Sequence, residues 1–205
     1  MEFEQELQLV IVSVTLGGII GLMSSITMFL IQRYIDTKGK VLIFYKKTFV
    51  DIDKDVKGGF SEKDSVVDLS IPLVFEFQNT TNTTKVIRDI SLFLYKNGKK
   101  LNKMYQINFI KKSNSKGGKI TKEEKIEFGS EKNSYSFVIP QHSIQKQYCY
   151  FGYFIQKEEI QNNIFDEIRL RYFNENNKEK VSKFMKIENC WRIQNFEVDN
   201  EWRKL

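Results

Sequence analysis

The chain has 205 residues, of which 41% are hydrophobic, 14% aromatic and 28% charged, and its formal net charge is +6. With only two prolines and 11 glycines, this composition excludes collagen-like, low-complexity and most disordered proteins. Cys149 and Cys190 are too few for a disulfide framework or a structural zinc site, so we expect free thiols. The length suffices for one folded domain and one additional segment.

The additional segment is an apolar run close to the N-terminus. Residues 9–31 are 23 consecutive residues without a charge. At a rise of about 1.5 Å per residue, a helix of this length spans about 35 Å and can cross a hydrocarbon core of about 30 Å. The preceding residues 1–8 carry three glutamates and no basic residue, unlike the start of a secretory signal peptide. We therefore predict a transmembrane helix over residues 9–31 and a short extracytoplasmic segment over residues 1–8.

The distribution of positive charge predicts the orientation of this helix. Residues 1–8 contain no lysine or arginine, whereas residues 32–47 contain five basic residues and one acid, Asp36. Basic flanks remain on the cytoplasmic side of a membrane. We expect a single-pass protein of the inner (cytoplasmic) membrane with its N-terminus outside and the rest of the chain in the cytosol.

Four small residues recur at every fourth position of the predicted helix. They are Ser13, Gly17, Gly21 and Ser25. Small residues on one helix face allow two helix backbones to approach closely in lipid, which favours a homo-oligomer. The alternative is that glycine and serine are simply common in membrane helices. The span has no ionisable residue, so a single copy offers no pathway for protons or ions.

The remainder of the chain is dominated by a period of two, which is typical of β-strands. Apolar residues alternate with polar ones from Leu69 to Phe77, and Asn97 with Gly98 predicts a type I′ hairpin. The run from Gln147 to Ile155 is apolar on both faces and predicts a central strand.

We count about eight strands at intervals of 10 to 20 residues and no long helical pattern between them. The predicted fold class is therefore mainly β, with one N-terminal transmembrane helix followed by an antiparallel β-sandwich or barrel. We assign the cytosolic domain to residues 41–194, a short charged juxtamembrane linker to residues 32–40 and a tail to residues 195–205. The tail fits either a short helix or a strand.

Lysines gather in the middle of the domain, where nine lie between Lys99 and Lys125 against two glutamates. The candidate basic surface comprises Lys99, Lys100, Lys103, Lys111, Lys112, Lys116 and Lys119. It could contact anionic lipid or a small anionic ligand, or form only a solvated hairpin. Nucleic acid is the less favoured partner, because only six of the 32 basic residues are arginine.

One acidic loop has the spacing of calcium ligands. Asp51, Asp53, Asp55 and Glu62 occupy the first, third, fifth and twelfth positions of an EF-hand loop. However, Val56 stands where that loop needs glycine, and the flanking residues fit strands. We treat these residues as a weak calcium candidate beside the alternative of an acidic surface loop, and expect no cofactor.

Nothing in the sequence indicates catalysis. His142 is the only histidine, and no motif of a hydrolase, a nucleotide-binding loop or a zinc protease is present. We therefore expect no enzymatic activity.

These patterns together predict a non-enzymatic single-pass membrane protein. Its cytosolic β-domain binds a protein partner or ligand at the bilayer, and the helix associates with other copies. In layout alone, the chain resembles bacterial defence effectors that join short membrane helices to a small cytosolic β-domain gated by cyclic nucleotides. Those proteins commonly have two or more membrane helices, and no ligand-binding motif corresponds residue by residue. The resemblance implies an alternative function, a ligand-gated effector that perturbs the membrane.

Overall fold

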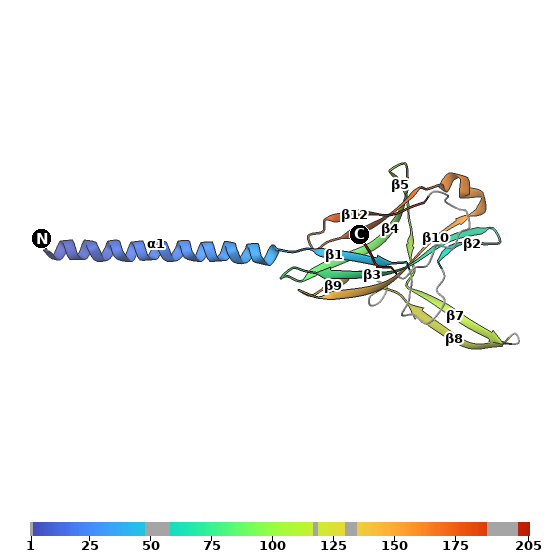
Figure 1. The fold of residues 1–205 in the computed structure, drawn as a ribbon, viewed down its shortest axis with the longest axis horizontal. Helices are drawn as coiled ribbons and strands as arrows, with labels where there is room; N and C mark the ends of the chain where they lie inside the picture. Colours follow the sequence, from blue (N-terminus) through green and yellow to red (C-terminus); the bar gives the residue numbers. More distant parts are fainter. Residues whose placement is uncertain (1, 48–57, 117–118, 130–134, 188–200) are drawn as a thin grey trace.

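The computed structural model describes residues 2–47, 58–116, 119–129, 135–187 and 201–205. A single long helix, α1 (Glu2–Thr37), projects from one end of a β-domain (Figure 1). The strands are β1 (Val41–Lys46), β2 (Gly59–Lys63), β3 (Val66–Asn79), β4 (Lys85–Lys96), β5 (Lys99–Lys103), β6 (Tyr105–Gln106), β7 (Phe109–Lys116), β8 (Lys119–Glu127), β9 (Phe137–Ile139), β10 (Ile144–Gln156), β11 (Glu167–Phe173), β12 (Glu179–Lys186) and β13 (Arg203–Lys204). A 3-10 helix, η1 (Lys157–Asn163), joins β10 to β11. The predicted mainly β fold with one apolar N-terminal helix is confirmed.

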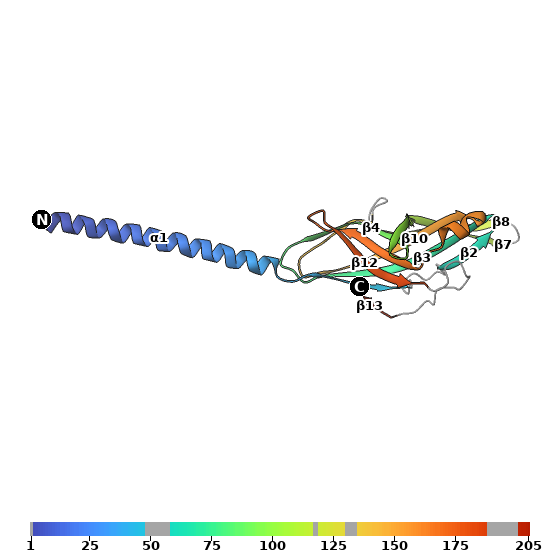
Figure 2. The ribbon, with the colours of Figure 1, turned by 90° about the horizontal axis from the view of Figure 1, so that it is seen from above.

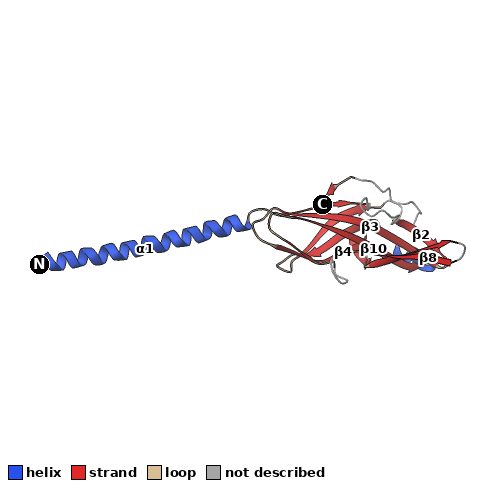
Figure 3. Ribbon diagram, turned by 90° about the horizontal axis from the view of Figure 1, so that it is seen from below, coloured by secondary structure: helices blue, strands red, loops and turns tan. Residues whose placement is uncertain are grey.

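The β-domain is an antiparallel sandwich. One sheet has the strand order β13-β1-β3-β10-β6, with β2 also pairing with β3. The other has the order β12-β11-β4-β5, with β9 also pairing with β4. Figure 3 shows these strands lying over one another in the β-domain, beyond the end of α1. Since the described strands form two separate main sheets, the structure is a sandwich and not a closed barrel.

The core lies between the two sheets and is formed by the apolar residues that alternate along the strands. The longest pairing joins β3 to β10 and runs from Ile144 opposite Gln78 to Gln156 opposite Val66. Along β3, Leu69, Leu73, Phe75 and Phe77 have no exposed surface, and Leu92 and Leu170 are equally buried in the other sheet. Burying a side chain of this size stabilises a fold by about 1.5–3 kcal/mol. The prediction that β10 is a central strand is confirmed, because it lies between β3 and β6.

The structure contains a predicted hairpin, β4 with β5, and a second hairpin, β7 with β8. Asn97 and Gly98 both have positive φ, 50° and 75°, as the predicted type I′ turn requires between β4 and β5. The second hairpin, β7 with β8, forms its own two-stranded sheet and points away from α1 in two views (Figures 1 and 2). Its base is fixed by a hydrogen bond of 2.6 Å from the Gly129 N–H to the Tyr148 carbonyl. Phe128 stacks on Tyr150 with ring centroids 5.1 Å apart.

Both flanks of the domain differ in detail from the expected segments. Residues 32–37 contain neither glycine nor proline, and α1 continues through them to Thr37. Most of the juxtamembrane linker is therefore helical. Within the tail, β13 pairs with β1, with Lys204 opposite Phe44, so this end of the chain is a strand and not a helix. The described residues form thirteen strands where we expected about eight, because β2, β5, most of β7 and the two-residue strand β13 lack clear alternation.

Candidate functional site

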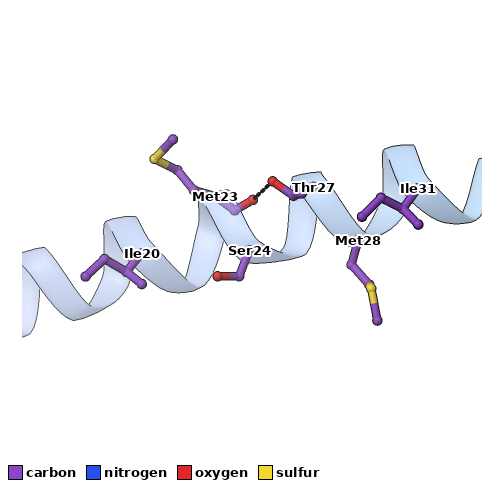
Figure 4. Close-up of a pocket in the computed structure, with 6 residues that line it drawn as sticks. All are labelled: Ile20, Met23, Ser24, Thr27, Met28 and Ile31. Atoms are coloured by element: carbon purple, nitrogen blue, oxygen red, sulfur yellow. Dashed lines mark hydrogen bonds between the residues drawn. The ribbon is translucent and has the colours of Figure 1, made fainter.

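The surface of α1 is suited to hydrocarbon. The segment Ile11–Asp36 has a mean hydropathy of 2.0, and none of its most apolar window is buried against the rest of the chain. The hydroxyls inside it are satisfied within the helix. The Thr15 hydroxyl donates to the Ile11 carbonyl at 2.9 Å, and the Thr27 hydroxyl to the Met23 carbonyl at 2.8 Å (Figure 4). The helix is long and apolar enough to cross a bilayer and exposes no unsatisfied hydroxyl at these positions.

The small-residue face of α1, composed of Ser13, Gly17, Gly21 and Ser25, is exposed along the helix. A Cβ atom added at Gly17 or Gly21 would meet nothing within 4 Å. The Ser25 hydroxyl donates to the Gly21 carbonyl at 2.9 Å and so presents little polarity to its surroundings. The shallow hollow beside this face is lined by Ile20, Met23, Ser24, Thr27, Met28 and Ile31 (Figure 4). Within the single chain, both glycines are open to lipid or to another helix.

Hydrogen bonds attach α1 directly to the sandwich at a junction formed by residues 38–40 and the turn after β3. The Lys40 N–H donates to the Thr80 hydroxyl at 2.9 Å, and the Thr80 N–H donates to the Lys40 carbonyl at 3.1 Å. The Asn82 amide donates to the Ile35 carbonyl in the last turn of α1 at 3.2 Å. His142 contacts the Asn82 amide oxygen at 2.6 Å and helps to orient it. The junction therefore leaves little freedom between helix and domain.

Replacing Gly39 by alanine is expected to disrupt this junction. Gly39 has φ of +101°, and a Cβ there would clash with the carbonyl oxygen of Thr80. The strained backbone and the clash should destabilise the domain by about 1–3 kcal/mol. Urea denaturation of the full-length protein in detergent measures this loss. Gly18→Ala is the matched control, because that glycine is helical with open space around it. Equal midpoints for the two variants would contradict the role of Gly39.

A cavity of about 360 Å³, the junction cavity, opens beside the junction. Its lining residues are Gly39, Lys40, Val41, Thr81, Lys85, Ile87, Tyr172, Asn174, Glu175 and Lys180. The Lys85 ammonium forms an ion pair of 2.7 Å with Glu175. Burial would raise the pKa of the Glu175 carboxyl, but the hydrogen bond and charge of Lys85 outweigh it and hold that pKa below its usual value. The cavity thus combines three lysines, one carboxylate and an apolar wall.

Two aromatic side chains, the distal patch, lie exposed near the other end of the sandwich. Tyr105 on β6 is 62% exposed and Phe154 on β10 is 45% exposed, and their ring centroids are 6.2 Å apart. The register places β10 residue Ile144 opposite Gln78, next to the junction. Phe154 is ten residues further along, or about 33 Å at a rise of about 3.3 Å per residue. Exposed neighbouring aromatics of this kind are typical of protein-binding surfaces.

The structure distributes the predicted basic surface over two hairpins. Lys99, Lys100 and Lys103 belong to β5, Lys111, Lys112 and Lys116 to β7, and Lys119 to the start of β8. The Lys100 ammonium lies 3.8 Å from the ring centre of Phe93, and that of Lys103 lies 3.3 Å from Asp89. The β7–β8 hairpin points away from α1 (Figure 1).

A partly exposed carboxylate, that of Asp89, links strands β4, β5 and β11 of the second sheet. Asp89 adopts a positive φ of 49° and accepts hydrogen bonds from Ser91 at 2.8 Å and Arg171 at 2.8 Å. Burial would raise the pKa of Asp89, but the Ser91 hydrogen bond and the charges of Lys103 and Arg171 hold it below its usual value. The Arg171 guanidinium also covers the ring of Phe93 at 4.5 Å. Because Phe93 is only 3% exposed, this cluster is a structural one that leaves no open ring for stacking a ligand.

Acid should weaken the fold. Asp89, Glu167 and Glu175 all have a lowered pKa, and for Glu167 the hydrogen bond from Arg169 is the largest cause. A carboxyl with a lower pKa in the folded than in the unfolded state adds stability above its unfolded pKa, near 4, and loses it as the pH falls through the folded pKa. The melting temperature of the full-length protein should drop from about pH 5 to about pH 3. Glu175→Gln should flatten this drop, whereas the exposed control Glu158→Gln should not. A melting temperature that rises in acid would contradict the assignment.

The calcium candidate is mostly outside the described residues. Asp51, Asp53 and Asp55 lie there, whereas Glu62 is on β2 and binds the Lys157 ammonium at 2.5 Å. In the part of the chain that the structure describes, no three His, Cys, Asp or Glu side chains come together as metal ligands.

Among the described cysteines, Cys149 is a free thiol, and complete burial raises its pKa. Such a thiol is inert and packs as a small apolar side chain.

Comparison with protein-family models, with curated proteins and with solved structures finds no match to this chain.

Proposed function

We propose that the chain is a non-enzymatic single-pass membrane protein that presents a binding domain at the cytosolic face of the inner membrane. The observation that carries this proposal is the exposed apolar surface of α1. No described residue of α1 belongs to the buried core, which is built from the β-domain. Such a long apolar helix requires another apolar medium to cover it, and a bilayer supplies one. The junction then holds the sandwich close to the membrane surface.

Binding is assigned to the end of the sandwich that faces the cytosol. The distal patch offers two exposed aromatic rings, and the nearby β7–β8 hairpin carries several lysines. Aromatic anchors with basic neighbours fit a protein partner with an acidic surface, or an anionic ligand.

Chemical cross-linking in membranes of the native host tests this binding assignment. The double variant Tyr105→Ser/Phe154→Ser should reduce cross-linked partner at least about tenfold while staying in the membrane. The matched control is Val138→Ser/Ile144→Ser, because these apolar residues are 55% and 60% exposed but lie outside the distal patch, Val138 on β9 and Ile144 ten residues before Phe154 on β10. Equal cross-linking by the wild-type protein and the distal-patch variant would contradict the assignment.

Self-association through the small-residue face is part of the proposal. Gly17→Leu and Gly21→Leu should each weaken the oligomer about tenfold, because leucine keeps the helix backbones apart. Energy transfer between labelled copies in detergent measures this change. Gly18→Leu is the matched control, since Gly18 is adjacent in sequence, equally open and about 100° away around the helix. The same loss in all three variants, or none, would contradict a specific interface.

The junction favours one second candidate function, a ligand-gated effector that perturbs the membrane. Hydrogen bonds between Lys40 and Thr80 would transmit a movement of the sandwich to α1 without slack. In that case, expression should depolarise bacterial cells once the ligand is present, and Gly17→Leu or Gly21→Leu should abolish the effect. A steady membrane potential in every condition would contradict the effector function and leave the binding function as the only candidate.

A further inference from the structure

We propose that the junction cavity binds the phosphate group of an anionic phospholipid from the leaflet that faces the sandwich. This inference rests on the proposed membrane function and adds a ligand and a site to it. The cavity measures about 360 Å³, within the range of small-ligand sites, and lies between β1, β4 and β11 at the end of the domain nearest α1.

The position of the cavity matches the depth of lipid headgroups. The apolar run ends at Ile31, and α1 continues for six residues to Thr37, or about 9 Å at about 1.5 Å per residue. The headgroup region of one leaflet is about 5–8 Å thick. Gly39 and Lys40, which line the cavity, follow directly and are held by the bonds to Thr80. The cavity therefore faces the outer edge of the headgroups.

The lining of the cavity suits a phosphate. Lys85 is neutralised by Glu175, so the ammonium charges of Lys40 and Lys180 are in excess. Each lysine close to an anionic membrane surface contributes attraction within about one Debye length.

A neutral donor adds to these charges. The side-chain oxygen of Asn174 accepts backbone hydrogen bonds from Asn176 at 3.2 Å and Lys178 at 2.8 Å, which leaves its NH₂ group as the donor for a ligand. The buried Ile87 and the half-buried Val41 give the cavity an apolar wall that a glycerol backbone can contact.

Binding of short-chain phosphatidylglycerol to the full-length protein in neutral detergent tests the proposal. Lys40→Gln/Lys180→Gln should weaken this binding about 10- to 30-fold, because two lysines are lost. Lys96→Gln/Lys186→Gln is the matched control, since it removes the same charge from exposed residues outside the cavity and should bind as the wild-type protein does. Equal affinity in all three proteins, or equal affinity for short-chain phosphatidylcholine, would overturn the proposal.

A second binding experiment, with the soluble compound glycerol 1-phosphate, distinguishes a lipid headgroup from a soluble phosphate as the ligand. If glycerol 1-phosphate binds as tightly as the lipid and the cavity variant loses both, the phosphate site stands and its ligand is soluble, which overturns the lipid source. Weak binding of glycerol 1-phosphate supports the lipid. Failure of the proposed membrane function is recognised separately, because the protein would then not reconstitute into lipid nanodiscs at all.

Discussion

Two arginines in the middle of α1 should release the protein from the membrane. In Leu16→Arg/Ile20→Arg, each arginine costs about 2.5–3.5 kcal/mol at the centre of a bilayer. The sum of about 5–7 kcal/mol lowers the insertion equilibrium by about four orders of magnitude or more. The fraction of protein that resists an alkaline carbonate wash of membranes measures insertion. It should fall from nearly all to nearly none.

The matched control for this experiment is Leu16→Ala/Ile20→Ala, which keeps the helix apolar and should remain in the membrane. Both side chains are more than half exposed along α1, at 52% and 59%, so neither pair of substitutions removes packing from the β-core. An arginine variant that stays in the carbonate-resistant fraction would contradict a transmembrane α1.

Phe151→Ala should be the most damaging substitution within the sandwich. The Phe151 ring is completely buried and meets Tyr135 edge to face, with ring centroids 5.3 Å apart. The Tyr135 hydroxyl in turn donates to the Ile107 carbonyl at 2.7 Å and accepts from the Tyr150 N–H at 2.9 Å. Removing the ring leaves a cavity and loosens this support, at a cost of about 3–5 kcal/mol in the free energy of unfolding. Urea denaturation measures that loss.

Phe154→Ala is the matched control, because it makes the same change on the same strand. Phe154 is 45% exposed, so its loss should cost less than about 1 kcal/mol. Equal costs at the two positions would contradict the assignment of the faces of β10.

The fold was largely predictable because its main signals are local. An uninterrupted apolar run identifies a membrane-length helix, and the alternation from Leu69 to Phe77 identifies one buried face of β3. The turn at Asn97 and Gly98 depends on two residues that tolerate positive φ. The β7–β8 hairpin was harder to recognise, because lysine is its commonest residue and neither face alternates clearly. The backbone hydrogen bonds between β7 and β8 stabilise this hairpin although its residues have low strand propensity.

The candidate site was much less predictable, because its parts meet only through the topology. The junction joins Lys40 to Thr80 across forty positions of sequence, and the junction cavity adds Lys180 from β12. In the sequence, Thr80 lies within the polar residues 78–84, and nothing marks it as a contact of Lys40. Tyr105 also carried no signal, because its exposure depends on the short edge strand β6 beside β10.

The two ends of the sandwich suggest a division of roles. Under the proposed function, the end with the junction cavity lies at the bilayer, whereas the end with the distal patch and the β7–β8 hairpin extends into the cytosol. This arrangement would let one domain contact lipid and a partner at the same time.

The accessibility of two single cysteines in membranes tests the central claim most directly. In a Cys190→Ser background, Cys149 is buried and stays silent, so Glu6→Cys reports the N-terminus and Lys178→Cys reports the sandwich. An impermeant maleimide should label the cysteine at position 6 in intact cells and the cysteine at position 178 only after the membrane is opened. Labelling of position 178 in intact cells would contradict a cytosolic β-domain held by a membrane-spanning α1.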